Sequence, residues 1–368
     1  MTRHRIAVIA GDGIGREVIP AGVAALQAAT TGSGVELSFA ELPWGCEYYL
    51  AHGRMMDADG FARLEQFDAI YLGAIGAPGV PDGVSAALIL AIRQRFDQYV
   101  NLRPMRLLAG IVSPLAARGA DAIDMVCVRE NSEGEYAGVG GRIHRGTDHE
   151  VAEQTGVFTR RGIERILRYG FELAARRPRR LLASATKSNA LTYAMVLWDE
   201  VAEAVRQEYP AVEYRKYHVD ALAARMITHP HTLDVIVASN LFGDILTDIG
   251  SAISGSLGIA PGANINPTRR YPSMFEPIHG SAPDIAGKGI ANPIGAVWAG
   301  ALMLDHLGHR ELHDRIVGAI ERVVADGAVR TPDLGGRAST ADVAGAIVRE
   351  IGMRESSAPV NKSIVQRG

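Results

Sequence analysis

Short apolar runs alternate with longer amphipathic stretches along most of this 368-residue chain. The runs have the length of buried strands, whereas the stretches between them, such as Arg16–Ala29 and Arg161–Arg176, have helical periodicity. This alternation predicts an α/β architecture. The expected strands are Arg5–Ala10, Val35–Glu41, Asp68–Leu72, Ile123–Val128, Arg180–Ala185, Tyr214–Val219 and Asp234–Ser239.

The end of the chain shows helical patterns without intervening strands. Ser339 is a candidate N-cap, with Asp342 three residues later in a variant of the capping box. The tail 357–368 is polar and without periodicity, so we expect it to be disordered. The three helices expected here are Ile294–Leu304, Leu312–Ala325 and Thr340–Ile351, and the first is too short to span a bilayer.

Composition narrows the class of protein. The chain is 47% hydrophobic and 21% charged, which is ordinary for a soluble globular protein, and long enough for two domains. A net charge of only -3 provides no field that would attract nucleic acid or an anionic membrane, so neither is expected as a partner. Two cysteines, Cys46 and Cys127, indicate a reducing compartment. Because a strand begins at Arg5, no signal peptide is expected, and we predict a cytoplasmic enzyme.

Two carboxylates lie four residues apart, at Asp244 and Asp248, in a helical segment that follows the apolar run Asp234–Ser239. Residues at this spacing share one helix face, and two like charges there repel unless a cation lies between them. Carboxylate oxygens suit Mg²⁺ or Mn²⁺, so we predict a hard-cation site, to which Asp220 is a third candidate ligand. An exposed acidic helix face is the alternative. The histidines show no spacing typical of zinc.

Cationic side chains follow several of the expected strands. Arg93, Arg103 and Arg129 suit bidentate binding of a small dicarboxylate if they converge, although each alone is more often a surface residue. Lys187 directly follows a strand and is a candidate general base, with an exposed loop lysine as the alternative. Tyr136, in the Gly-rich segment 134–146, is a candidate general acid or a packing residue.

Two Gly-rich segments are candidate cofactor sites. Gly11–Gly15 has the spacing G-x-G-x-G, which does not match the Rossmann fingerprint and equally fits a tight strand-to-helix turn. The segment Glu276–Pro293 is too rich in glycine and proline for a helix or central strand, so we expect a functional loop. Within it, Asp284 is suited to accept a hydrogen bond from a ribose 2′-hydroxyl.

In combination, these motifs resemble the β-decarboxylating dehydrogenases, the family of isopropylmalate and isocitrate dehydrogenases. The resemblance extends from Ile6 to about Ile351. The segments that carry it are Gly11–Gly15, Asn101–Pro104, Arg129–Asn131, Ala185–Asn189, Asn240–Asp248 and His279–Asp284.

The resemblance implies a two-domain α/β fold that is not a Rossmann fold. Its cofactor-binding domain is discontinuous and expected at 1–100 plus 255–356, and the inserted dimerisation domain at 101–254. A Gly-rich arm near 134–150 is expected to project from the body of the protein. Family members are typically homodimers with shared active sites, and a requirement for a monovalent cation such as K⁺ stays open.

The resemblance also implies roles for single residues. Arg93, Arg103 and Arg129 correspond to substrate-binding arginines, Tyr136 to the general acid, and Lys187 to the base supplied by the neighbouring subunit. The metal ligands would be Asp244 and Asp248, with Asp220 from the neighbour. Asp284 implies NAD rather than NADP. The implied NAD-binding residues are His279, Gly280, Ser281, Ala282, Asp284, Ile285 and Asn292.

Within the family, Trp44–Tyr49 and Phe96–Pro104 resemble the branch that oxidises tartrate and decarboxylates D-malate, with Mn²⁺ or Mg²⁺ as the metal. Ala87 and Ile89 stand where isocitrate-specific members carry serine and asparagine, which disfavours isocitrate. Ile89 also supports an alternative, 3-isopropylmalate dehydrogenase of leucine synthesis. A second alternative, a non-catalytic regulatory subunit, is disfavoured because the implied acid, base and metal ligands are all present.

Overall fold

The computed structural model describes residues 1–115 and 123–353. The segment predicted to form a disordered tail, 357–368, lies outside the described residues. Every strand and helix expected from the hydrophobic pattern is present, with ends that differ by a few residues. The α/β prediction is therefore confirmed.

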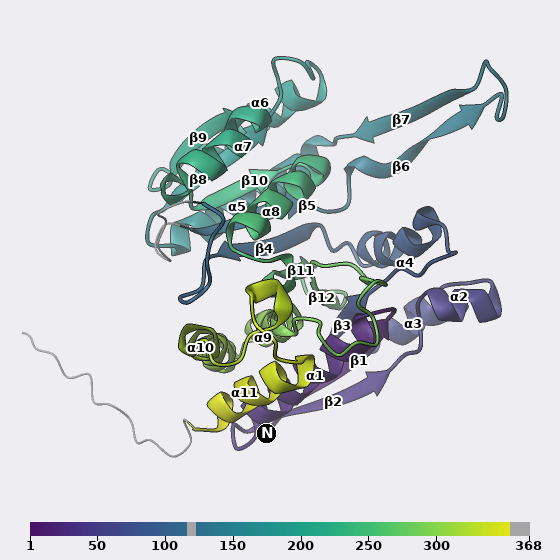
Figure 1. Cartoon of the computed structure of the whole chain (residues 1–368). Coiled ribbons are helices and arrows are strands. Elements are labelled where there is room, and N and C mark those ends of the chain that lie inside the picture. The colour runs from purple at the N-terminus through teal and green to yellow at the C-terminus, as the bar shows by residue number, and fades with distance from the viewer. Residues whose placement is uncertain (116–122, 354–368) are drawn as a thin grey trace, which may run out of the picture.

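A single mixed sheet of ten strands runs through the molecule, in the order β2-β1-β3-β12-β11-β4-β5-β10-β8-β9 (Figure 1). Most neighbours are parallel, but β11 is antiparallel to both β12 and β4, and β4 is antiparallel to β5. The strands of this sheet are β1 (Thr2–Gly11), β2 (Val35–Glu41), β3 (Ala69–Ala74), β4 (Val100–Arg106), β5 (Asp124–Glu130), β8 (Leu181–Thr186), β9 (Glu213–His218), β10 (Val235–Ala238), β11 (Pro261–Ile265) and β12 (Ser273–Pro277).

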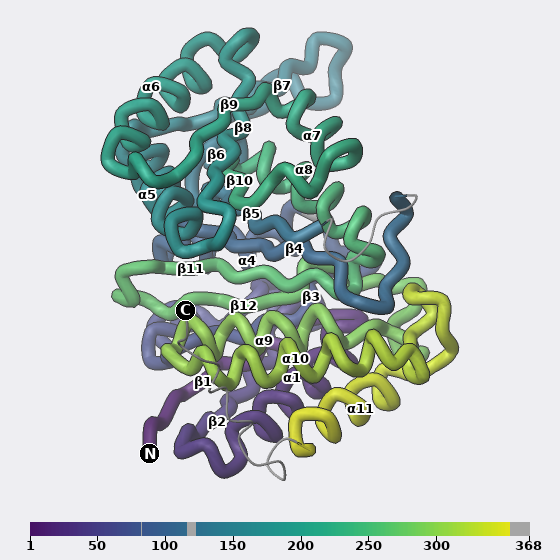
Figure 2. The backbone as a smooth tube through the Cα atoms, turned by 90° about the vertical axis from the view of Figure 1, so that its left-hand side faces the viewer, coloured from purple at the N-terminus to yellow at the C-terminus, as the bar shows by residue number. Residues whose placement is uncertain are grey.

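Helices pack on the sheet and bury two apolar clusters. Helix α9 (Ile294–His306) is buried almost throughout and packs with α1 (Gly15–Thr30) and α10 (Arg310–Asp326), as Figure 2 shows. Helix α11 (Thr340–Met353) packs in turn on α1 and α10. The smaller cluster lies under α4 (Asp82–Arg95). The other helices are α2 (Cys46–His52), α3 (Gly60–Leu64), α5 (Arg160–Arg176), α6 (Ala194–Arg206), α7 (Val219–Thr228) and α8 (Asn240–Ile253).

Strands from both chain ends form one half of the sheet, from β2 to β11, and strands from the middle of the chain form the other half, from β4 to β9 (Figure 1). The domain boundaries expected above stay a prediction. A separate hairpin of β6 (Gly134–Ile143) and β7 (Val151–Val157) extends outward from the sheet. Its side chains Val139, Ile143 and Val151 are exposed.

Local chemistry explains where several elements begin. Gly11 and Gly13 have φ values of 70° and 51°, so the first Gly-rich segment is a tight strand-to-helix turn that requires glycine. At the start of α11, the amide of Ser339 donates to the Asp342 carboxylate at 2.9 Å, and the Asp342 amide donates to the Ser339 hydroxyl at 3.1 Å. This reciprocal pair is the predicted variant of the capping box.

Two local predictions were wrong. Glu276 and Pro277 end the buried strand β12 instead of opening a loop, because Pro277 occupies the last strand position. The strand expected at Tyr214–Val219 ends at His218, so Val219 begins α7 and Asp220 lies in its first turn, where a carboxylate complements the helix dipole.

The contact between α1 and β3 leaves no room for a side chain at Gly22. An added Cβ would lie 1.7 Å from the hydroxyl oxygen of Tyr71, which is fully buried and donates to the Ala296 carbonyl at 2.6 Å. We expect Gly22→Ala to lower the free energy of unfolding by about 1–3 kcal/mol, as overpacking does. Denaturant titration measures it.

The matched control is Gly345→Ala in α11, where an added Cβ would meet only the mobile end of Arg349 at 3.3 Å. Here the better helix propensity of alanine should raise the free energy of unfolding by about 1 kcal/mol. Equal effects of the two substitutions would contradict the importance of the Tyr71 contact.

Candidate active site

Helix α8 carries the two predicted metal ligands at the carboxyl end of the buried strand β10. Asp244 is half-buried and Asp248 is exposed at the next turn of the same face. Partial burial, with a contribution from the charge of Asp244, raises the pKa of Asp248. Asp248 has no hydrogen-bond or ion-pair partner among the residues that the structure describes. Oxygen donors so arranged fit a hard divalent cation.

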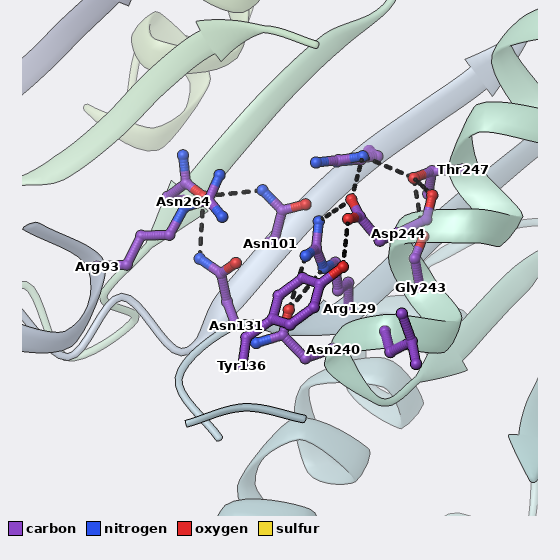
Figure 3. A network of polar contacts seen from close by, with 12 residues as sticks. Arg93, Asn101, Arg129, Asn131, Tyr136, Asn240, Gly243, Asp244, Thr247 and Asn264 are labelled. Carbon is purple, nitrogen blue, oxygen red and sulfur yellow. Dashed lines mark hydrogen bonds and ion pairs between the residues drawn. The ribbon is translucent and has the colours of Figure 1, made fainter. Parts of the chain in front are cut away.

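Arg129, the penultimate residue of β5, crosses under α8 and is only 2% exposed. Its Nη1 lies 2.5 Å from Asp244 Oδ1, and its Nε and Nη2 donate to Asn240 Oδ1 at 3.0 and 2.7 Å (Figure 3). Burial first, and the positive charge of Arg103 second, lower the pKa of Arg129 to about 9. The carboxylate and amide of α8 therefore hold this buried guanidinium in place.

Gly243 makes this arrangement possible. A Cβ there would lie 2.6 Å from Cγ and 2.7 Å from Cβ of Arg129, so a larger residue would displace the arginine. We did not identify Gly243 as a site residue from the sequence. The signal was present, because a glycine inside an amphipathic helix is unfavourable unless something approaches it closely.

The three predicted substrate arginines converge. Arg103 lies on β4, donates to Thr247 Oγ1 at 2.7 Å and forms a 3.4 Å ion pair with Asp244. Burial lowers the pKa of Arg103, and both Arg93 and Arg103 lower that of Arg129 by charge repulsion. Three guanidinium groups this close, with few carboxylates around them, favour an anionic guest.

Arg93 joins this cluster from α4 through a buried polar network. Its Nη2 donates to Glu276 Oε1 at 2.8 Å, and the side-chain Nδ2 of Asn264 donates to the same oxygen at 2.7 Å. The side-chain Oδ1 of Asn264 in turn accepts hydrogen bonds from the side chains of Asn101 and Asn131, each at 2.9 Å (Figure 3). This network joins α4, β4, β11, β12 and the end of β5, and it was not predicted.

Tyr136, at the base of the hairpin on β6, faces the same carboxylate. Its hydroxyl donates to Asp244 Oδ2 at 3.1 Å, and the guanidinium carbon of Arg129 lies 5.6 Å from its ring centroid. Partial burial first, and the charge of Asp244 second, raise the pKa of Tyr136, so the phenol keeps its proton.

Lys187 and Asp220 lie apart from this cluster and pair with each other at 2.7 Å. The hydrogen bond from Lys187 lowers the pKa of Asp220. In the described residues, no three His, Cys, Asp or Glu side chains are grouped to hold a metal ion. The assignment of Lys187 and Asp220 to a neighbouring subunit's site stays a prediction.

The predicted cofactor loop packs against the first Gly-rich turn. The amide of Ile14 donates to the Ser281 carbonyl at 2.9 Å, and a Cβ on Gly13 would lie 2.1 Å from that oxygen. The amide of Gly287 donates to Glu17 at 2.6 Å. The two Gly-rich motifs that were distant in sequence thus form one surface.

Within this loop, Asn292 links two elements, because its Oδ1 accepts from the Ile294 amide at 3.0 Å and its Nδ2 donates to Asp333 at 2.9 Å. Burial lowers the pKa of His279. Asp284 is exposed, as a residue that binds a ribose must be. Ala282 and Ile285 are partly buried against the core, Ser281 is buried, and Gly280 borders open space.

A cavity of about 830 Å³ lies instead beside α1, against Asp12, Arg16 and Trp44. Its size is that of a ligand pocket. However, Asp12 accepts backbone amides at 3.0 Å and Arg16 is paired with Glu47 at 2.7 Å. Because these charges are already satisfied, the arginine cluster is the better candidate for an active site.

Comparison with known proteins agrees with this geometry. The family described as "Isocitrate/isopropylmalate dehydrogenase" matches residues 5–347. The chain belongs to the isocitrate/isopropylmalate dehydrogenase family. The fold and family implied by the motifs are thus confirmed, and dehydrogenases of this family in general use NAD and a divalent metal.

Individual family members are similar over nearly their whole length. D-malate dehydrogenase (decarboxylating) of Escherichia coli strain K12 is 54% identical over 95% of this chain and 99% of its own. Tartrate dehydrogenase/decarboxylase of Pseudomonas putida is 52% identical over 93% and 96%. The crystal structure of isocitrate dehydrogenase from Methylococcus capsulatus superposes with a TM-score of 0.85 at 35% identity, covering 95% of this chain and 99% of that one. No helix among the described residues is long and apolar enough to cross a membrane.

The close passage of Arg129 over Gly243 generates a prediction for this family member. We expect Gly243→Ala to weaken binding of a small dicarboxylate about 10-fold to 100-fold, since hydrogen bonds to charged groups contribute about 1.5–3 kcal/mol. Isothermal titration calorimetry measures the affinity, with Gly345→Ala as the control glycine in another helix. An unchanged affinity would mean that the Arg129 side chain can bind the dicarboxylate without passing over residue 243.

Proposed function

We propose that this chain is an NAD-dependent dehydrogenase, requiring Mn²⁺ or Mg²⁺, that oxidises tartrate and oxidatively decarboxylates D-malate to pyruvate and CO₂. The observation that carries this proposal is a cluster of three buried arginines, of which Arg103 and Arg129 pair with Asp244 of α8 and Arg93 pairs with Glu276. It is supported by 52% and 54% identity to relatives named tartrate dehydrogenase/decarboxylase and D-malate dehydrogenase (decarboxylating).

Charge explains why the substrate is a small dicarboxylate. Arg93, Arg103 and Arg129 bring three positive charges into a region of low dielectric. The two carboxylate groups of a hydroxy acid would offset this positive charge. The Nε atoms of Arg93 and Arg103 are buried without a partner in the described residues. Each unpaired N–H favours an additional acceptor from the substrate.

The proposed active site is shared between two copies in a homodimer. Asp244 and Asp248 of one copy would hold the metal together with Asp220 of the other. When bound, Mn²⁺ or Mg²⁺ supplies positive charge to the developing alkoxide and enolate oxygens. The loop from His279 to Asn292 would hold NAD, which would supply the hydride acceptor.

The proton transfers fall to two residues of the chain. Lys187, from the second copy, takes the proton of the substrate hydroxyl. Tyr136 gives a proton to the carbon from which CO₂ departs, and its raised pKa keeps the phenol protonated until that step. Because its hydroxyl already donates to Asp244 at 3.1 Å, it lies beside the carboxylate proposed to hold the metal.

One observation favours a second candidate, 3-isopropylmalate dehydrogenase. Ile89 of α4 is partly buried and packs on the apolar cluster that contains Leu88. An aliphatic surface beside Arg93 suits an isopropyl group, although hydrophobic pockets discriminate poorly between neighbouring substituents. A regulatory subunit is disfavoured, since the proposed acid, base and metal ligands are present.

The test is to follow NAD reduction with Mn²⁺ and D-malate, the tartrates or 3-isopropylmalate in parallel. We expect kcat/KM for D-malate and for one tartrate to exceed that for 3-isopropylmalate, because the chain is 54% and 52% identical to relatives named for D-malate and tartrate. The replacement Ile89→Ser serves as the matched probe of the aliphatic surface. Dominant turnover of 3-isopropylmalate, lost in Ile89→Ser, would overturn the proposal in favour of the second candidate.

A further inference from the structure

Two histidines that are 305 residues apart in the chain face each other far from the arginine cluster. His4 lies on β1, and His309 precedes the first turn of α10. Their Nε2 atoms are 2.8 Å apart, and their rings meet edge to face with centroids at 5.0 Å. The two imidazoles thus direct the same nitrogen at one point.

A carboxylate lies behind the first of these rings. Nδ1 of His4 is 4.0 Å from Asp68 Oδ2, and the same oxygen accepts the backbone amide of Arg5 at 2.7 Å. In metal sites, a histidine that binds through one nitrogen usually directs the other toward a carboxylate or carbonyl, which fixes the ring orientation. Asp68 lies on that side of the His4 ring, whose side chain is 13% exposed, although 4.0 Å is longer than a hydrogen bond.

His309 borders an open groove. The groove has a volume of about 750 Å³ and is also lined by Ser33, Val35 and Gly308. The nearest cation of α10, Arg310, is paired with Asp305 at 3.1 Å and with Asp314 at 3.0 Å, so its charge is offset. An ion and its water ligands therefore have both a route and space.

We propose that His4 and His309 bind one late first-row transition-metal ion, such as Zn²⁺, through their Nε2 atoms, with water completing the coordination. Two imidazole nitrogens on a tetrahedral Zn²⁺ at about 2.0–2.1 Å lie about 3.3 Å apart. The 2.8 Å pair therefore has to open by only about half an ångström to admit the ion.

The ligand type separates this site from the one on α8. Imidazole nitrogen selects Zn²⁺, Cu²⁺ or Ni²⁺, whereas carboxylate oxygen suits Mg²⁺ and Mn²⁺. A bound ion would connect the beginning of β1 to the beginning of α10, and so stabilise the folded chain against unfolding. It would not take part in the proposed reaction.

The test is calorimetric titration of the full chain with Zn²⁺ in excess Mg²⁺, which occupies the carboxylate site. We expect His4→Gln and His309→Gln each to lose one bound Zn²⁺ per chain relative to wild type. Asp68→Asn should keep the site but weaken it about 10-fold to 100-fold, the usual cost of losing a group behind a ligand. Zn²⁺ should raise the melting temperature of wild type but not that of His4→Gln or His309→Gln.

The matched control is the double variant His229→Gln/His231→Gln, whose rings are 6.1 Å apart at the end of α7. It should bind as much Zn²⁺ as wild type. If His4→Gln does not fold, His309→Gln decides, since it leaves β1 unchanged. Equal Zn²⁺ stoichiometry in wild type and in the folded variant would overturn the proposal and leave only a hydrogen-bonded pair.

Discussion

The candidate active site depends on a buried charge that must be paired. Arg129 is 2% exposed, and an isolated guanidinium at that depth would be strongly unfavourable. Asp244 and Asn240 satisfy it, so α8 must begin at the end of β10, beside the end of β5. The same requirement explains Gly243, whose missing side chain leaves space for the arginine. One ion pair thereby positions the helix that carries both carboxylates.

The antiparallel strands in the middle of the sheet connect this helix to the cofactor loop. Glu276, the penultimate residue of β12, holds Arg93 and lies three residues before His279, so the proposed substrate arginine and the predicted cofactor loop share one support. Asn264 on β11 joins that support to β4 and β5 through hydrogen bonds of 2.9 Å. This network is expected to hold the arginines in place, although Asn101 Oδ1, Asn131 Oδ1 and Arg93 Nε are buried without a partner in the described residues.

Sequence patterns were most informative where one segment contains the whole signal. Apolar periodicity predicted the parallel strands and the buried helix α9, and the spacing of Asp244 and Asp248 predicted a shared helix face. Strands β11 and β12 escaped because Pro, Gly, Asn, Ser and Glu interrupt their short sequences, so neither forms an apolar run. The contact of His4 with His309, like the asparagine network, joins distant segments, and spacing along the chain cannot reveal it.

The central claim is that one copy contributes the arginines, Tyr136 and two carboxylates, while Lys187 and Asp220 serve the other copy. Mixing inactive Tyr136→Phe with inactive Lys187→Ala, after unfolding and refolding together, tests it directly. With random pairing, about half of the dimers would be mixed, and each mixed dimer would have one intact site out of two. D-malate-dependent NAD reduction should therefore return to about one quarter of wild type. No activity above that of the two separate variants would contradict a shared site.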